Sequence, residues 1–311
     1  MSDLLPPAVS PGTTPAPSRA PFLRRLPPVP FALLALAMIF VLYQIIGGVI
    51  TLVIARGEIT PDNVGVIRWS TLFGQILFIL LPTLWLTRRR HGDLLKTLRI
   101  RLPELRDLVA TMIAVFALQQ VLQTYMILQD AIPLPKELQK AVDVFKNMFE
   151  ETYRLLVTTR TPLEFLMVVL IVAVVPAISE ELLFRGLVQR NLEDATGGWR
   201  GAVLAGVIFG FYHLNPFVIV PLVVLGVYFG FIVYRSDNIM LAVSAHFFNN
   251  FVACAAVYLK LDENFIAVAP SARPSGSLIA LNFMVFAVVF VAATLYFVHS
   301  TDHDEHEEEP F

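Results

Sequence analysis

Long apolar runs separated by short polar loops dominate the pattern along the chain. Eight of these runs meet or approach the roughly 17 to 25 apolar residues that a helix needs to cross a bilayer. They lie at residues 31–55, 65–86, 106–129, 162–186, 200–214, 217–234, 238–259 and 276–298. The fifth run is short and ends near Pro216, which breaks the helix. The pattern predicts an all-α, polytopic transmembrane helix bundle of about eight spans.

One polar insertion, residues 136–160, interrupts this pattern. Apolar side chains recur in it at helical spacing: Leu138, Val142, Phe145, Met148, Phe149 and Tyr153. Such spacing predicts an amphipathic helix that lies in the interfacial plane of the membrane. The alternative is a helix that packs over the bundle as a lid.

The two ends of the chain differ from the apolar middle. Residues 1–30 are rich in proline, serine and alanine and show no apolar periodicity, which predicts a disordered cytoplasmic tail. Residues 299–311 place three histidines among acidic residues. Nothing in this run fixes the geometry of metal ligands, so we expect a solvated acidic tail.

Composition supports the membrane interpretation. Hydrophobic residues make up 56% of the 311 residues and charged residues only 15%, so we expect the lipid bilayer as a partner and no nucleic acid. The single cysteine, Cys254, falls in an apolar run. One cysteine excludes an intramolecular disulfide framework and a cysteine zinc cluster, and we expect it to pack as a small apolar side chain.

Basic residues are concentrated in a few loops. The connection after the second run contains Arg88, Arg89, Arg90, Lys96, Arg99 and Arg101. The positive-inside rule places this loop in the cytoplasm. With eight spans, both termini of this multi-pass protein of the cell membrane are then cytoplasmic, and we expect the charged end of the fourth run to lie near the cytoplasmic side.

That charged end is residues 179–186, Ser-Glu-Glu-Leu-Leu-Phe-Arg-Gly. A charge at membrane depth costs roughly 2.5 to 3.5 kcal/mol on insertion scales, so each needs a partner, a wet cavity or a function. Glu181 and Arg185 are four residues apart and can form an ion pair along one helix face. Glu180 points about 100° away from Glu181 and has no cation at helical spacing. Its partner must therefore come from another helix.

Two later runs place histidine inside apolar sequence. His213 ends the fifth run, one turn after Phe209, which could wall a cavity beside it. His246 and Asn250 lie four apart in the seventh run, so they share a helix face. A lone intramembrane histidine or asparagine is more often a structural residue. Their joint occurrence with an unpaired glutamate favours a functional site, because intramembrane ionisable residues are functional candidates.

These groups suit hydrolysis of an amide. A carboxylate and an imidazole, Glu180 and His213, can deprotonate a water, while His246 and Asn250 can donate to the oxyanion that forms. The sequence contains neither G-x-S-x-G nor H-E-x-x-H, so the serine and zincin routes lack their signals. A zinc variant stays open, with Glu180, His213 and His246 as ligands.

The three motifs together resemble a known family. Glu-Glu-x-x-x-Arg (Glu180, Glu181, Arg185), Phe-x-x-x-His (Phe209, His213) and His-x-x-x-Asn (His246, Asn250) are similar to those of the CAAX prenyl protease and bacteriocin-processing family, also called Abi or CPBP. Its members are intramembrane endopeptidases, and eukaryotic ones cleave the last three residues after a prenylated cysteine. The resemblance covers about residues 162–259.

The resemblance implies a role for each motif residue. Glu180 and His213 would activate water, His246 and Asn250 would bind the oxyanion, and Glu181 and Arg185 would support the site. It also implies a peptide or lipidated protein substrate. Together with the apolar pattern, it predicts how the chain is divided. Residues 1–30 are the tail, 31–160 the first helices and the insertion, 161–260 the catalytic core, and 261–311 the last helix and acidic tail.

Two expectations follow for the structure. The fourth, fifth and seventh runs should converge so that Glu180, His213, His246 and Asn250 line one water-filled cavity open to the cytoplasmic side. We favour hydrolysis without metal, because no carboxylate lies at helical spacing from His213 or His246 to orient it as a zinc ligand. A proton-coupled transporter and a non-catalytic scaffold are the alternatives, although no inverted repeat supports a transporter.

Overall fold

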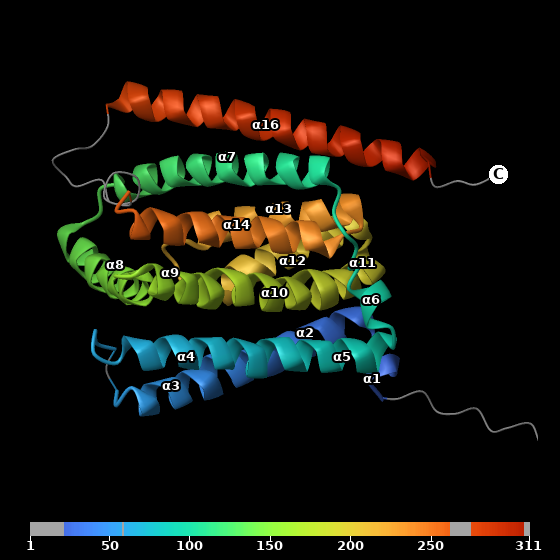
Figure 1. Cartoon of the computed structure of the whole chain (residues 1–311), viewed down its shortest axis with the longest axis horizontal. Coiled ribbons are helices and arrows are strands. Elements are labelled where there is room, and N and C mark those ends of the chain that lie inside the picture. Colours follow the sequence, from blue (N-terminus) through green and yellow to red (C-terminus); the bar gives the residue numbers. More distant parts are fainter. Residues whose placement is uncertain (1–21, 58, 262–274, 308–311) are drawn as a thin grey trace, which may run out of the picture.

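The computed structural model describes residues 22–57, 59–261 and 275–307, with side chains to residue 301, and all its regular elements there are helices (Figure 1). Seven of them are long and apolar enough to cross a membrane. These are Pro28–Ile54, Val64–His91, Leu105–Asp130, Pro162–Thr196, Ile219–Ser236, Ile239–Tyr258 and Gly276–Thr301. The all-α polytopic bundle predicted from the apolar pattern is confirmed.

The fifth of the eight expected spans, 200–214, is not among these seven and forms the 15-residue helix α12, Gly198–Tyr212. At 1.5 Å per residue α12 is about 22 Å long, short of the roughly 30 Å of bilayer hydrocarbon. It packs antiparallel on α13, Ile219–Ser236, and a Cβ on Gly206 would lie 2.3 Å from the Val227 nitrogen. Close backbone contact therefore ties α12 to α13 as a hairpin.

Several long helices contain π-helical segments. The first three spans are α2 (Pro28–Phe40), η1 (Val41–Gly47) and α3 (Gly48–Ile54), then α4 (Val64–Gln75), η2 (Ile76–Leu80) and α5 (Leu81–His91), then α7 (Leu105–Asp130). The fourth comprises α9 (Pro162–Val169), η3 (Leu170–Val174), α10 (Val175–Glu181), η4 (Leu182–Gln189) and α11 (Arg190–Thr196). The remaining elements are α1 (Phe22–Arg25), α6 (Leu94–Thr97), α8 (Lys136–Val157), α14 (Ile239–Tyr258) and α16 (Gly276–Glu307).

The bundle has two distinct ends. We call the end that holds α1, α6 and α11 the arginine-rich end, on the right in Figure 1, and the opposite end the α8 end. The described N-terminal segment and the C-terminal end of α16 both lie at the arginine-rich end. The predicted amphipathic insertion is helix α8, which crosses the other end of the bundle between α7 and α9.

Order begins before residue 31, where the disordered tail was expected to end. Helix α1 covers Phe22–Arg25 and α2 begins at Pro28. Arg90 holds this segment, donating hydrogen bonds to the carbonyls of Leu23 and Leu26 at 2.5 and 2.6 Å. Residues 1–21 lie outside the described part of the chain. At the other terminus α16 extends to Glu307, past the expected limit of 298, and the rest of the predicted acidic tail lies outside the described residues.

Candidate active site

A cavity of about 430 Å³ lies among α4, α8, α10, α12, α13 and α14. It contains the predicted Glu180, His213, His246 and Asn250, with Phe209 in its wall. The other lining residues are Thr71, Gln75, Phe149, Tyr153, Leu156, Ile171, Val172, Pro176, Asn215, Val218, Leu222, Leu225, Phe229 and Asn249. The structure thus brings together four polar groups that the sequence spreads over seventy residues.

Glu180 and His213 face each other inside this cavity. Glu180 Oε2 lies 3.7 Å from His213 Nε2, and the two side chains are 17% and 30% exposed. Glu180 Oε2 is buried and has no hydrogen-bond partner. A separation of 3.7 Å is too long for a good hydrogen bond but short enough for one water to bridge the two atoms.

The backbone at the end of α12 sets the orientation of His213. Its Nδ1 lies 2.8 Å from the carbonyl oxygen of Phe209, one turn earlier. A carbonyl can only accept, so Nδ1 carries the proton and Nε2, in the neutral ring, presents a lone pair to the cavity. Leu214 follows with a positive φ of 52°, and the chain leaves the helix at this point.

Glu181 contacts two other predicted residues. Its Oε1 accepts from Arg185 Nη1 at 3.0 Å, which is the ion pair expected from their spacing, and lies 2.8 Å from His246 Nδ1. Glu181 and Arg185 are fully buried, and Arg185 also donates to the carbonyl of Gly226. No carboxylate lies at helical spacing from His246 along its own helix, but Glu181 reaches it from another helix.

Asn250 lies beside His246 but is partly committed to other partners. Its Nδ2 donates to the carbonyl of Val172 at 3.1 Å, and its side-chain oxygen accepts from Asn249. An amide nitrogen carries two protons, so one N–H is left for the cavity. The bond to Val172 on η3 fixes the side chain between α14 and the helix that holds Glu180.

Phe209 separates the two histidines. Its ring centroid lies 4.7 Å from that of His213 and 5.9 Å from that of His246, both in edge-to-face contact. Phe229 stacks on the other side of His246 at 5.5 Å. The Arg185 guanidinium lies 4.6 Å from the Phe209 ring centre. Aromatic rings thus hold both imidazoles in place and limit their exposure to water.

The structure does not arrange the expected metal ligands around one point. Among the residues it describes, no group of three His, Cys, Asp or Glu side chains is disposed to hold a metal ion. This includes Glu180, His213 and His246, although all three line the cavity. The Glu181–His246 contact has the form of a carboxylate that supports a metal-bound histidine, but Glu180, His213 and His246 do not fit a metal ion in this arrangement.

Sequence reasoning missed part of the cavity wall. Thr71 and Gln75 come from α4, and Phe149 and Tyr153 come from the inner face of α8. Gln75 could have been predicted as a cavity residue, because it is a polar residue inside an apolar span. The α8 residues could not, since the same amphipathic pattern fits a helix lying freely on the membrane.

The lining of the cavity extends toward the α8 end of the bundle. Its outer wall includes α8 and residues of the 213–218 loop, where Gln129 near the end of α7 donates to the carbonyl of Phe217 at 2.9 Å. These elements lie at the α8 end (Figure 1). The cavity thus extends toward the α8 end, whereas we expected it to open at the end with the basic loops.

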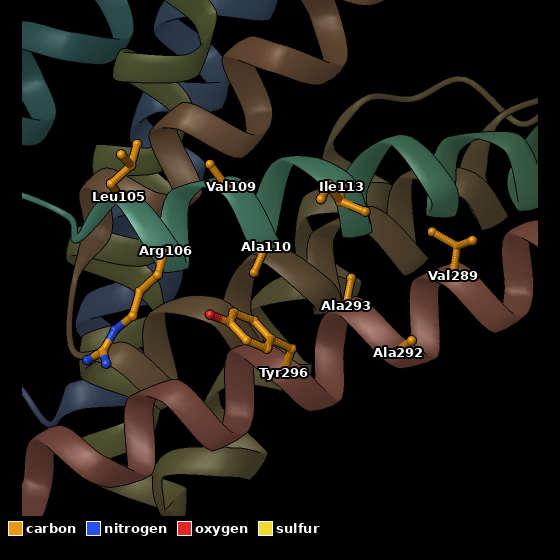
Figure 2. Close-up of a pocket in the computed structure, with 9 residues that line it drawn as sticks. All are labelled: Leu105, Arg106, Val109, Ala110, Ile113, Val289, Ala292, Ala293 and Tyr296. Carbon is orange, nitrogen blue, oxygen red and sulfur yellow. The ribbon is translucent and has the colours of Figure 1, made fainter.

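A larger hollow of about 680 Å³ lies between α7 and α16 (Figure 2). Its lining is apolar apart from Arg106, at the start of α7, and the Tyr296 hydroxyl. Arg106 is paired with Glu104 at 2.9 Å. The hollow contains no acid–base pair, so the smaller polar cavity is the candidate site.

Cys254 behaves as expected of a packing residue. It is fully buried in a cluster with Val157, Val168, Val169 and Ala173.

Comparison with known proteins points to one family. The family model described as Type II CAAX prenyl endopeptidase Rce1-like matches residues 162–252, less than a third of the chain but all three motifs. Searches of curated proteins and of solved structures found no match. Residues 162–252 are thus similar to the Rce1-like family of CAAX prenyl endopeptidases, and the helices of the chain are those of a multi-pass membrane protein.

Proposed function

We propose that this chain hydrolyses a peptide bond inside the membrane with a water held between Glu180 and His213. The observation that carries the proposal is the pair of facing acceptors, Glu180 Oε2 and His213 Nε2, 3.7 Å apart in a cavity. A water that donates one hydrogen to each keeps its lone pairs free to attack a carbonyl carbon. Glu180 then takes the proton as general base.

His246 and Asn250 are the proposed oxyanion donors. Asn250 has one N–H to offer. His246 donates through Nε2 only as an imidazolium, because its Nδ1 proton points to Glu181. Glu181, also paired with Arg185, fixes the orientation of the His246 ring. When the tetrahedral intermediate collapses, Glu180 returns its proton to the leaving amine.

The proposed catalytic unit is residues 161–260, as expected from the motifs, with a wall supplied by α4 and α8 from residues 31–160. A zinc-dependent version with Glu180, His213 and His246 as ligands would need these side chains to rearrange, so the metal-free mechanism is our proposal. A transporter is disfavoured because buried Arg185 and Gln189 fill the bundle between the cavity and the arginine-rich end.

The test is a protease assay on the purified full chain in lipid nanodiscs with a library of plain and lipidated peptides. We expect Glu180→Gln and His213→Gln to lose turnover and keep the folded yield. Glu164→Gln is the matched control, since Glu164 lies on the same long helix, outside the cavity, and accepts from the Arg160 nitrogen. Unchanged turnover in Glu180→Gln would refute the proposal.

A further inference from the structure

The candidate cavity extends toward one end of the bundle, and the two ends differ in their number of basic residues. Thr71 on α4, Phe149 and Tyr153 on α8, and Asn215 after α12 line the cavity between Glu180 and the α8 end. Each comes from an element that begins, ends or lies at that end (Figure 1).

The opposite direction is closed by packed polar groups. From Glu181 a row at four-residue spacing continues through Arg185, Gln189 and Glu193 toward the arginine-rich end. Arg185 and Gln189 are fully buried, and Gln189 donates to Glu193 at 2.8 Å and to the carbonyl of Gly230 at 3.0 Å. Glu193 is then paired with Arg99. No peptide can pass along this row without breaking it.

Basic residues indicate which end is cytoplasmic. Twelve described Lys or Arg residues lie at the arginine-rich end: Arg24, Arg25, Arg88, Arg89, Arg90, Lys96, Arg99, Arg101, Arg106, Arg190, Arg200 and Arg235. Seven lie at the α8 end: Arg56, Lys136, Lys140, Lys146, Arg154, Arg160 and Lys260. The excess places the arginine-rich end in the cytoplasm by the positive-inside rule. The α8 end then faces outward.

Helix α8 is built as a fixed cover over this end of the cavity. Arg68, buried in α4, donates to the carbonyls of Leu155, Leu156 and Thr158 at the C-terminal end of α8. Lys146 pairs with Asp130 at 2.6 Å. Both charged contacts tie α8 to the outer ends of neighbouring helices.

The remaining contacts of α8 are apolar. Its Phe149 ring contacts that of Phe217 at 6.1 Å. Val144, Phe145 and Met148 of α8 are exposed, as expected for a helix that rests in the membrane interface. A substrate entering at this end must pass beside or beneath α8.

We propose that the substrate reaches Glu180 from the extracytoplasmic side, at the edge of α8. The substrate is then an extended peptide segment on the outer side of the membrane, either an exported peptide or the outer juxtamembrane segment of a membrane protein. The substrate class rests on the proposed protease function, whereas the side of access rests on the cavity and the charge distribution alone.

Thiol labelling tests the side of access without any assay of activity. In a Cys254→Ala background we would label single cysteines in intact cells with a membrane-impermeant maleimide. Thr71→Cys is a nearly isosteric change that reports on the cavity. Glu137→Cys reports on the surface of α8, where the Glu137 side chain is 87% exposed. Leu102→Cys reports on the arginine-rich end, where Leu102 is 96% exposed. We expect Glu137→Cys and Thr71→Cys to react in intact cells, and Leu102→Cys only after permeabilisation.

Every other labelling pattern counts against the proposal. Reaction of Leu102→Cys in intact cells with protection of Glu137→Cys would reverse the orientation. Reaction of Thr71→Cys only after permeabilisation, or under neither condition, would show that the cavity does not open outward, and Asn215→Cys serves as a second cavity reporter against local misfolding.

Measuring peptide turnover after thiol modification provides a second, independent test. Modification of Thr71→Cys from outside should lower turnover, whereas modification of Glu137→Cys should not. If the labelling pattern holds but no peptide is ever cleaved, the proposed protease function fails and the outward opening stands. If peptides are cleaved but Thr71→Cys reacts only from the cytoplasm, the protease function stands and this inference fails.

Discussion

Glu180 and Glu181 are neighbours in the chain, but their surroundings in the bundle are opposite. Glu180 faces a cavity, is partly exposed and has an oxygen without a partner. Glu181 is fully buried between Arg185 and His246. The difference follows from the helix turn of about 100° per residue, which points adjacent side chains at different neighbours. One carboxylate is left free for chemistry, and the other is committed to structure.

Removing the Glu180 carboxylate should have the largest effect on turnover and little effect on stability. We expect Glu180→Gln to lower kcat by about 10²- to 10⁴-fold, the usual contribution of a general base. The free energy of unfolding should change little, because Glu180 Oε2 has no hydrogen-bond partner to lose. Turnover of a cleaved peptide and thermal unfolding in the same lipid nanodiscs measure both effects. A comparable loss of folding would break the proposed distinction between the two glutamates.

Removing the Glu181 carboxylate should act on stability first. Glu181→Gln leaves the buried Arg185 without its counter-ion, which costs about 3 to 5 kcal/mol in the free energy of unfolding. Because Glu181 also contacts His246, we expect turnover of the remaining folded protein to fall as well. Denaturant unfolding checks the first effect, and kcat per folded molecule checks the second.

The Glu181→Gln/Arg185→Met double variant sharpens this prediction. It removes both buried charges and should recover part of the lost stability while leaving the turnover defect. No recovery would show that the ion pair is not the source of the instability.

Truncating Asn250 tests its proposed role as an oxyanion donor in the cavity. Loss of one oxyanion donor typically lowers kcat by 10²- to 10³-fold, about 2.7 to 4 kcal/mol. We expect Asn250→Ala to lower kcat by the smaller figure, because one of its N–H groups is bound to the Val172 carbonyl rather than to the cavity. Asn249→Ala is the neighbouring control, and an equal kcat loss there would point to a general packing defect.

Chelation should have the smallest effect. If Glu180 and His213 activate water by themselves, exhaustive removal of divalent ions leaves kcat unchanged. Metal analysis of the purified chain together with kcat before and after chelation measures this. One bound zinc per chain, with kcat lost on its removal and regained on its return, would contradict the metal-free mechanism and would make Glu180, His213 and His246 the candidate ligands.

Helix periodicity explains how much of the site could be predicted. The ion pair of Glu181 with Arg185 depends on contacts along one helix, and it was anticipated from spacing alone. The convergence of Glu180, His213 and His246 could also be expected, because polar groups in apolar spans avoid lipid. The Glu181–His246 contact could not, since it depends on the rotation of α14 relative to α10, which no local pattern encodes.

The amino-acid sequence by itself determined the membrane character of this protein, its apolar spans, the amphipathic helix and the residues of the candidate site, because hydropathy and helical spacing are local properties. Only the tertiary structure decided that α12 is a short helix held against α13, that α8 contributes to the wall of the cavity, and that the lining of this cavity extends toward the α8 end. These features depend on how helices distant in sequence cross and pack, and close packing allows few such arrangements.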